Sequence, residues 1–304
     1  MTPSTVPVQR GRLLASSEQN DREPGVSRRL RGSTAWSVRL RRAVRTPKGL
    51  LLGVLCVLLL IAGRVEGLAR VGPGLACGIA AALVIDVPML RWRRRRWTFP
   101  DGGLITALLI AAVVSPRDAW YVCAVATAIG LAAKHLLRTA SANVFNPAAL
   151  GLVCVYYLFD SAQSWWGALP AIVPGAAWPI LLGGTTLLAW RVHRLHLAAA
   201  FLAVYFVIFS VSTFVVDVRD VAEIFVAPDL LAAVFFAGFM LTDPPTSPAR
   251  PWAQMVNGGV VALAGAAIFF GTGAVHYLLG GLLCGNLVEA ARRMGAARRR
   301  LRES

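Results

Sequence analysis

The chain has 304 residues, of which 57% are hydrophobic and 15% are charged, and its mean hydropathy is +0.62. A soluble domain carries about 25% charged residues, so the composition argues against a soluble protein and indicates a membrane protein. The net charge of +16 does not indicate nucleic-acid binding, because the basic runs flank apolar segments as membrane anchors do, and no nucleic-acid-binding module accompanies them.

The chain divides into three predicted regions. Residues 1–47 are polar, arginine-rich and aperiodic, which predicts a disordered cytoplasmic tail. Residues 48–292 form a predicted transmembrane domain, and residues 293–304 form a second basic cytoplasmic tail. We therefore expect an all-α polytopic membrane protein with about ten transmembrane helices, at 49–65, 73–90, 102–116, 119–137, 146–160, 176–190, 197–216, 229–243, 254–272 and 274–290.

Several of these segments are shorter than the roughly 20 residues that span a bilayer, and 102–116 is the clearest example. Protein must cover the ends of such helices at membrane depth. With a cytoplasmic N-terminus, alternation through ten spans places 27 of the 31 Lys and Arg residues inside and four outside. This split follows the positive-inside rule and predicts that both termini are cytoplasmic.

Two of the apolar segments resemble each other. Pro100–Pro116 reads PDGGLITALLIAAVVSP and Pro228–Pro244 reads PDLLAAVFFAGFMLTDP, with the same Asp-to-Pro spacing at an offset of 128 residues. They are the third and eighth segments, so the chain is predicted to consist of two five-helix halves. An odd number of helices per half makes the second half inverted, an arrangement that places a site near the midplane between the halves. Chance similarity of two apolar stretches is the alternative.

Two acidic residues lie inside apolar segments. Asp86 lies in the second and Glu289 near the end of the tenth. An intramembrane carboxylate suggests function, because its insertion costs roughly 2.5–3.5 kcal/mol. We therefore name Asp86 as a candidate for an ion pathway, while pairing with nearby arginines (91–96 for Asp86, Arg292 and Arg293 for Glu289) remains the structural alternative.

The histidines and cysteines are expected to have structural roles. His135, His193 and His196 accompany Lys and Arg residues on the cytoplasmic side, which favours surface anchoring, and His276 is expected alone on the outer side. The five cysteines lie in apolar runs without a CxxC pair, which favours packing. Iron–sulfur ligation by a subset such as Cys77 and Cys123 is the alternative. No Walker loop, GxGxxG after a strand, HExxH motif or nucleophile elbow is present.

The stretch SANVFNPAALGLV, residues 141–153, brings polar residues to the start of the fifth segment. Pro147 suits the first position of a helix and Asn146 the N-cap. This local explanation leaves Asn143 unexplained. An amide can also hydrogen-bond the carbonyls and N–H of a planar heterocycle, and a helix N-terminus suits an anionic or reduced ring.

Several stretches together resemble one family in order and spacing. They are FPDGGLITALLIAAVVSPRDAW, AKHLLRTASANVFNPAALGLV, WPILLGGTTLLAWRVHRLHLAAAFL, FFAGFMLTDPPTSPARP and HYLLGGLLCGNLVEAAR. Residues 50–290 resemble the RnfD/NqrB family, which comprises RnfD of the Rnf electron-transport complexes and NqrB of the sodium-pumping NADH:quinone oxidoreductases. The combination of NPAA and TDP carries most of this resemblance.

The resemblance implies a ten-helix component of the bacterial cytoplasmic (inner) membrane that is related in fold to urea and ammonium channels. It implies electron transfer through flavins, coupled to Na⁺ or H⁺ movement. Asn143, Asn146 and Pro147 would bind a non-covalent flavin, riboflavin or FMN, near the cytoplasmic side. Thr242 and Asp243 match the TDP motif on the same side, and we add Thr106 to this candidate set. No metal site is expected.

One departure from the family concerns covalent FMN. The family carries an S-G-A-T motif after the fifth helix, whose threonine is esterified to the FMN phosphate. Here the corresponding residues are Pro174, Gly175, Ala176 and Ala177. Since alanine has no hydroxyl, and Ser161 and Ser164 lie nearby without the motif, we expect no covalent FMN.

Three functional hypotheses follow. The first is a redox subunit that relays electrons through a bound flavin and is not catalytic alone. Its partners would be other Rnf/Nqr-like membrane subunits or an extracytoplasmic FMN-binding protein, together with membrane lipids. The second is a non-redox channel or transporter for a small solute. Replacement of the FMN-linked threonine by Ala177 favours this hypothesis. The third is an assembly scaffold without a cofactor.

Overall fold

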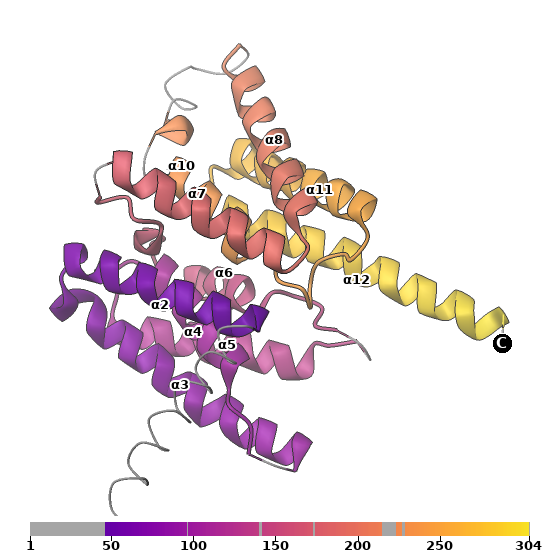
Figure 1. The fold of residues 1–304 in the computed structure, drawn as a ribbon, viewed down its shortest axis with the longest axis horizontal. Coiled ribbons are helices and arrows are strands. Elements are labelled where there is room, and N and C mark those ends of the chain that lie inside the picture. Colours follow the sequence, from indigo (N-terminus) through magenta and orange to yellow (C-terminus); the bar gives the residue numbers. More distant parts are fainter. Residues whose placement is uncertain are drawn as a thin grey trace, which may run out of the picture. The chain divides into compact units, whose positions relative to one another are not determined.

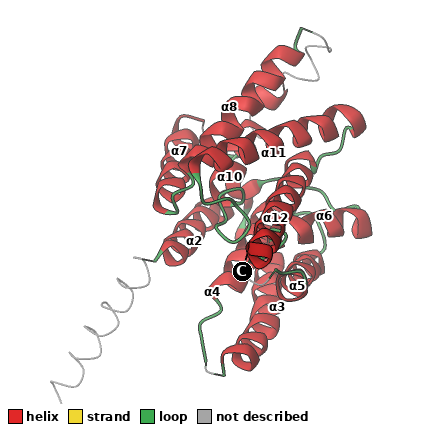
Figure 2. Cartoon of the chain, turned by 90° about the vertical axis from the view of Figure 1, so that its right-hand side faces the viewer, coloured by secondary structure: helices red, strands yellow, loops and turns green. Residues whose placement is uncertain are grey.

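A computed structural model describes residues 46–95, 97–139, 142–172, 174–214, 223–226 and 229–303. All of them belong to one compact unit, Ala43–Ser304. The predicted disordered tail, apart from its last two residues, lies outside this described part. Within the described residues the regular structure is helical, as Figure 2 shows. The all-α prediction is confirmed for these residues.

Each predicted apolar segment corresponds to one helix. The first half consists of α2 (Pro47–Glu66), α3 (Leu68–Arg94), α4 (Asp101–Val113), α5 (Trp120–Leu136) and α6 (Pro147–Phe159). The second consists of α7 (Pro174–Arg191), α8 (Leu195–Ser212), α10 (Asp229–Phe239), α11 (Pro251–Thr272) and α12 (Tyr277–Glu303). Two short 3₁₀ helices, η1 (Trp166–Ala168) and η2 (Glu223–Phe225), lie in the connections before α7 and before α10.

The lengths of these helices fit a polytopic membrane protein. Among the described residues, α2, α3, α8 and α11 are long and apolar enough to cross a bilayer, and α4, α5, α6 and α10 are shorter apolar helices. The long helices also present large apolar side chains on the outside of the bundle, such as Leu60, Val84, Val207 and Leu263. Lipid, rather than water, suits such surfaces.

Two short helices, α4 and α10, lie at the centre of the bundle. Both begin at an aspartate, and nearly all of their residues are buried. Their ends are covered by protein, as short helices at membrane depth require. At the end of α4, Val114 pairs with Gln163 of the α6–α7 connection. Beyond the end of α10, the Asn146 amide donates to the Met240 carbonyl over 3.0 Å.

Three helix pairings of the first half recur in the second, whereas the packing of α4 on α5 and α6 is not matched at α10 among the described residues. In the first, α2 packs on α4, α3 on α5, and α5 on α6; in the second, α7 packs on α10, α8 on α11, and α11 on α12. The halves meet through contacts of α6 with α12 and of α2 with α7 (Figure 1). The resemblance between the third and eighth segments is therefore accompanied by a repeat of contacts.

Candidate functional site

A cavity of about 420 Å³ lies where the starts of α2, α4 and α6 meet the end of α10. This volume falls in the range of about 300–1,000 Å³ typical of small-molecule sites. The cavity brings together five of the six candidate flavin residues: Thr106, Asn143, Asn146, Pro147 and Asp243. The other lining residues are Pro47, Lys48, Leu51, Gly102, Ile105, Leu109, Lys134, Ala148, Val192, Phe239, Pro244 and Pro245.

Asn146 holds the start of α6 in place. Its side-chain oxygen accepts from the Ala149 N–H over 3.1 Å, which confirms the predicted N-cap, and Pro147 takes the first helical position. Its side-chain nitrogen donates to Met240 O, and its backbone N–H donates to Asn286 Oδ1 over 2.8 Å. Since both amide atoms are engaged and the residue is 2% exposed, Asn146 shapes the cavity wall.

Asn143 differs from Asn146 in having a free side chain. Its backbone pairs with Arg138 in an isolated bridge, which fixes the loop before α6. The residue is half-buried and lines the cavity. Its amide makes no hydrogen bond to any residue in the described part of the chain. Asn143 is therefore the wall residue whose amide is available to a ligand.

Two threonines of the candidate set have similar bonds but different positions. Thr106 Oγ1 donates to Gly102 O over 2.9 Å in α4, and Thr242 Oγ1 donates to Gly238 O over 2.6 Å at the end of α10. Thr106 lines the cavity, whereas Thr242 is 5% exposed and lies outside its lining. The structure therefore separates Thr242 from the other candidates.

Asp243 is the acidic group of the cavity wall. It lies in the loop beyond α10, where Thr246 Oγ1 donates to its carboxylate over 3.2 Å. Burial raises the pKa of Asp243 to about 6, against the opposing effects of this hydrogen bond and of Lys48, Lys134 and Arg194. The charge of this wall therefore changes near neutral pH.

A buried charged cluster lies behind the cavity. Asp86 is fully buried, and its Oδ1 lies 2.9 Å from both Lys134 Nζ and His135 Nε2. Its Oδ2 accepts from the backbone N–H of Gly103 over 3.1 Å, where a Cβ would lie 2.8 Å from the carboxylate. Glycine at 103 thus permits the contact that ties α3 to the start of α4. Lys134 belongs to both the cluster and the cavity wall.

The cluster differs from two interpretations of the sequence, the alternative in which Asp86 pairs with arginines and the surface role expected for His135. Asp86 pairs with Lys134 and His135, and the structure gives it no contact to the described arginines of 91–96. His135 is 6% exposed, so the expected surface role is wrong for this residue, although His193 and His196 are exposed. Arg93 reaches the same region by donating to the His135 carbonyl over 3.0 Å.

Two other titratable residues also acquire partners. Glu289 pairs with Arg292 and Arg293 at 2.7 Å each, as the structural alternative predicts. His276, expected to lie alone, is 6% exposed and lies 3.1 Å from the Tyr157 hydroxyl, beside the ring of Tyr156. The prediction of an isolated His276 is therefore wrong.

Several contributors to the site were missed in the sequence. Lys134, Phe239 and Pro245 line the cavity, and Asn286 positions Asn146 from 140 residues away. Lys134 carried a signal, because a lysine among apolar residues suggests a buried acidic partner. The partnership of Asn286 with Asn146 has no local signal, since it depends on the packing of α12 against α6.

Comparison with known proteins identifies the family. The model of the NQR2, RnfD, RnfE family matches residues 38–177 and 169–277. The chain belongs to this family. The residues matched by the family model therefore include the short buried helices α4 and α10 and all six candidate flavin residues.

Curated relatives of this chain match a shorter stretch. The D component of an ion-translocating oxidoreductase complex from Pseudomonas paraeruginosa is 37% identical over 100 residues, which cover 32% of this chain and 29% of the relative. The D component of a proton-translocating ferredoxin:NAD(+) oxidoreductase complex from Clostridium ljungdahlii is 31% identical over 96 residues, covering 31% and 29%. The matched stretch thus spans less than a third of the length of each relative.

In this member of the family, Ala177 lies in the first turn of α7 and is fully buried. Ser161 is 4% exposed in the preceding connection. The cysteines are free thiols, and the described residues contain no group of three or more His, Cys, Asp or Glu side chains that could hold a metal ion.

Proposed function

We propose that this chain is a membrane subunit of an ion-translocating oxidoreductase complex and that its cavity binds a non-covalent flavin. The observation that carries the proposal is the convergence of Thr106, Asn143, Asn146, Pro147 and Asp243 on one cavity. These residues come from α4, the loop before α6, the start of α6 and the loop beyond α10. A flavin bound there accepts and gives up electrons one or two at a time.

The walls of the cavity fit a flavin in size and chemistry. Ile105, Leu109 and Phe239 supply apolar surface for a planar ring. The Asn143 amide can donate to a ring carbonyl and accept from a ring N–H. Lys48 and Lys134, with the N-terminal ends of α2, α4 and α6, favour negative charge on the ligand. In this proposal Asn143 recognises the ring, while Asn146 and Pro147 keep the cavity open.

The proposal includes ten membrane crossings in two inverted halves, both termini in the cytoplasm, and location in the bacterial inner membrane. Contacts between helix ends and connecting segments support the alternation. Arg194 donates to Ser247, and Arg93 donates to the His135 carbonyl, which joins segments assigned to the cytoplasmic side. Tyr157 contacts His276, which joins segments assigned to the outer side.

We further propose that the complex supplies electron donors and acceptors through other membrane subunits or an extracytoplasmic FMN-binding protein. Coupling to Na⁺ or H⁺ belongs to this proposal, and Asp86 is its candidate ion-pathway residue. Both oxygens of Asp86 are engaged by Lys134, His135 and Gly103. This supports a role in proton movement more than binding of a bare cation.

Covalent FMN is proposed to be absent, because Ala177 has no hydroxyl with which to form a phosphoester. The test is flavin fluorescence of acid-precipitated protein on a denaturing gel. We expect no fluorescent band at the mass of this chain. A fluorescent band would contradict the proposal, and Ala177→Thr expressed beside a flavin transferase provides the comparison lane.

The flavin proposal is tested by the absorbance spectrum of the protein purified in detergent. We expect flavin bands that Asn143→Leu removes. Thr106→Val and Thr242→Val form a matched pair, since both remove a hydroxyl bonded within its own helical turn but only Thr106 lines the cavity. Thr106→Val should weaken flavin binding, and Thr242→Val should leave it unchanged. Colourless protein that moves a solute into liposomes would instead support the channel hypothesis.

A further inference from the structure

A second cavity, of about 390 Å³, lies beside the first and is rich in arginine. Its walls come from the loops before α6, before α8 and before α11, and from α12. The lining residues are Ala142, Arg194, Pro244, Pro245, Ser247, Ala249, Glu289, Arg292 and Arg293. We call it the arginine cavity. The proposed topology places all four of these wall segments on the cytoplasmic side of the membrane.

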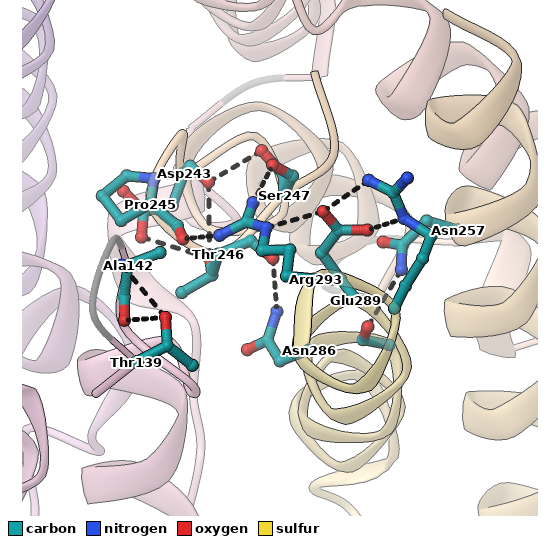
Figure 3. A network of polar contacts seen from close by, with 12 residues as sticks. Thr139, Ala142, Asp243, Pro245, Thr246, Ser247, Asn257, Asn286, Glu289 and Arg293 are labelled. Carbon is teal, nitrogen blue, oxygen red and sulfur yellow. Dashed lines mark hydrogen bonds and ion pairs between the residues drawn. The ribbon is translucent and has the colours of Figure 1, made fainter. Parts of the chain in front are cut away.

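Arg293 builds the frame of the arginine cavity. Its side chain donates to Glu289 Oε1, Pro245 O and Ser247 O, each over 2.7 Å. Figure 3 shows Arg293 between Glu289 on one side and the loop of Pro245 and Ser247 on the other. These bonds fix α12 to the loop before α11 and use all three nitrogens of the guanidinium group. Arg293 therefore holds the walls of the cavity in place.

Arg194 and Arg292 keep donors available for a ligand. Arg194 is 9% exposed, and its Nε and Nη1 donate to Ser247 Oγ and to two backbone carbonyls of the α7–α8 connection. Arg292 donates to Glu289 through Nε and Nη2. The remaining terminal nitrogens, Nη2 of Arg194 and Nη1 of Arg292, have no partner in the described part of the chain. Two guanidinium groups of the lining can therefore still donate to an acceptor in the cavity.

The charge of the arginine cavity is not balanced by its own residues. Three guanidinium groups and one carboxylate, that of Glu289, line it, which leaves an excess of two positive charges in the lining. Burial lowers the pKa of Arg194, and the charge of Arg293 acts in the same direction, against the opposing effects of Glu289 and Asp243. An anion in the cavity would offset this repulsion between the arginines.

The face of α12 that leads to the arginine cavity is apolar and exposed. Arg292 lies one helical turn beyond Val288, so both project from the same face of α12. Leu287 and Val288 are 50% and 48% exposed, and Cys284, a further turn back, is also exposed. Trp252 is 54% exposed at the start of α11, just after the loop that lines the cavity, and tryptophan is enriched at membrane interfaces. A ligand with an anionic head and apolar chains therefore fits the cavity and this face together.

We propose that the arginine cavity binds the phosphate headgroup of an anionic phospholipid from the cytoplasmic leaflet, whose acyl chains lie along the exposed face of α12. Arg194 and Arg292 hold the non-bridging phosphate oxygens through charge-assisted hydrogen bonds, and Arg293 positions the loop opposite α12. An anionic lipid binds better than a zwitterionic one, because the excess positive charge of the lining repels the ammonium group of the zwitterionic headgroup. No flavin is needed for this binding, and the proposed topology decides only which leaflet supplies the lipid.

The test is a titration of delipidated protein in neutral detergent with dioleoyl phosphatidylglycerol and with dioleoyl phosphatidylcholine, followed by native mass spectrometry. We expect phosphatidylglycerol to bind about tenfold more tightly, which corresponds to about 1.4 kcal/mol. Arg292→Gln should bring this ratio to within about twofold, because it removes both a donor and a positive charge. Arg298→Gln removes the same charge from an exposed position on the same helix; it is the matched control and should keep the ratio.

Two outcomes of this titration would overturn the lipid site. One is equal binding of the two lipids by the unchanged protein. The other is an equal loss from Arg292→Gln and Arg298→Gln, which would show a diffuse attraction to the basic end of α12. Arg194→Gln provides a second variant that should lower the ratio as Arg292→Gln does, and thermal unfolding without lipid verifies that each variant is folded.

A free phosphate offers the same acceptor oxygens without acyl chains. Inorganic phosphate is therefore added in large molar excess to the protein with bound phosphatidylglycerol. We expect the lipid to remain bound, because the apolar face of α12 holds its chains. Displacement by phosphate would assign the arginine cavity to a soluble anion and overturn the lipid assignment. Protein without flavin absorbance that still prefers phosphatidylglycerol would overturn the flavin proposal and leave the lipid site standing.

Discussion

The two short central helices, α4 and α10, occupy corresponding places in the two halves but are held by different chemistry. The start of α4 is fixed by a charged cluster, in which Asp86 accepts from Gly103 and pairs with Lys134. The position 128 residues after Asp86 is Phe214, an uncharged residue that is 88% exposed.

Aromatic rings surround α10 instead. Phe235 stacks on Phe239 with ring centroids 4.6 Å apart, Phe236 packs on Phe201 at 5.1 Å, and Trp165 lies 6.4 Å from both Phe235 and Phe236. A repeated scaffold can thus keep some of its helix pairings while the surroundings of one central helix become charged and those of the other aromatic. The proposed flavin cavity lies where the charged start of α4 meets the aromatic end of α10.

The largest expected effect comes from the charged side of this comparison. Asp86→Asn keeps the shape of the side chain but leaves Lys134 without its buried carboxylate, so we expect the free energy of unfolding to fall by about 3 kcal/mol or more. Denaturant titration in detergent measures it. Asp101→Asn is the control, because its pair with Lys48 is exposed and contributes less than about 1 kcal/mol. Equal effects of the two changes would contradict the assigned role of Asp86.

The stability of the aromatic core around α10 should depend on side-chain volume, so that a large loss of volume is destabilising and a conservative replacement is tolerated. Phe236→Ala removes a fully buried ring and should lower the free energy of unfolding by about 3–5 kcal/mol. Phe236→Leu keeps most of the apolar volume and should cost less than about 1.5 kcal/mol. If Leu were as damaging as Ala, ring packing would not explain how α10 is held.

Asn146 and Asn143 test the cavity where the start of α4 meets the end of α10. Asn146→Ala removes the cap of α6 and leaves Met240 O with only the longer bond from the Asp243 N–H, so we expect a loss of about 2–3 kcal/mol in the free energy of unfolding. Asn143→Ala should cost less than about 0.5 kcal/mol, because no described residue bonds its amide. Thermal unfolding without added flavin distinguishes the two. A large loss from Asn143→Ala would make that residue structural.

The smallest expected effect is the pH dependence due to Asp243. Since burial raises its pKa to about 6 in the folded protein, the folded state binds more protons than the unfolded state between about pH 4 and 6. This contribution to stability therefore falls as pH rises through that window and is constant above it. Asp243→Asn should remove the effect, changing the difference in Tm between pH 4.5 and 7 by roughly 3 °C. Identical pH profiles for the two proteins would contradict the raised pKa.

The sequence predicted the helices well because apolar runs and flanking charges are local signals. Helix ends were predicted less well. The eighth segment was expected to continue to Asp243, but α10 ends at Phe239. The Asn146 amide donates to the Met240 carbonyl just beyond this end, and Pro244 and Pro245 have no backbone N–H to continue the helix. Helix α12 continues through the basic C-terminal residues to Glu303.

The site was predicted in part for the same reason. Asn146 and Pro147 were recognised as a cap from neighbouring residues alone, and the structure confirms that role. The partners of Asp86 were not predicted, because Lys134 and His135 lie 48 and 49 residues away and approach only when α3 packs on α5. Contacts between distant segments determine which polar residues share a cavity.

The hydrogen bonds of Asn146 have a mechanical consequence. Through Met240 and Asn286 they fasten the start of α6 to the end of α10 and to α12, so one residue bridges both halves. Separating the halves at this end would break both hydrogen bonds at once and leave four buried polar groups without these partners. The hydrogen bond between Tyr157 and His276 joins the same two halves at the other end of α6, so α6 resists relative rotation of the halves at both of its ends.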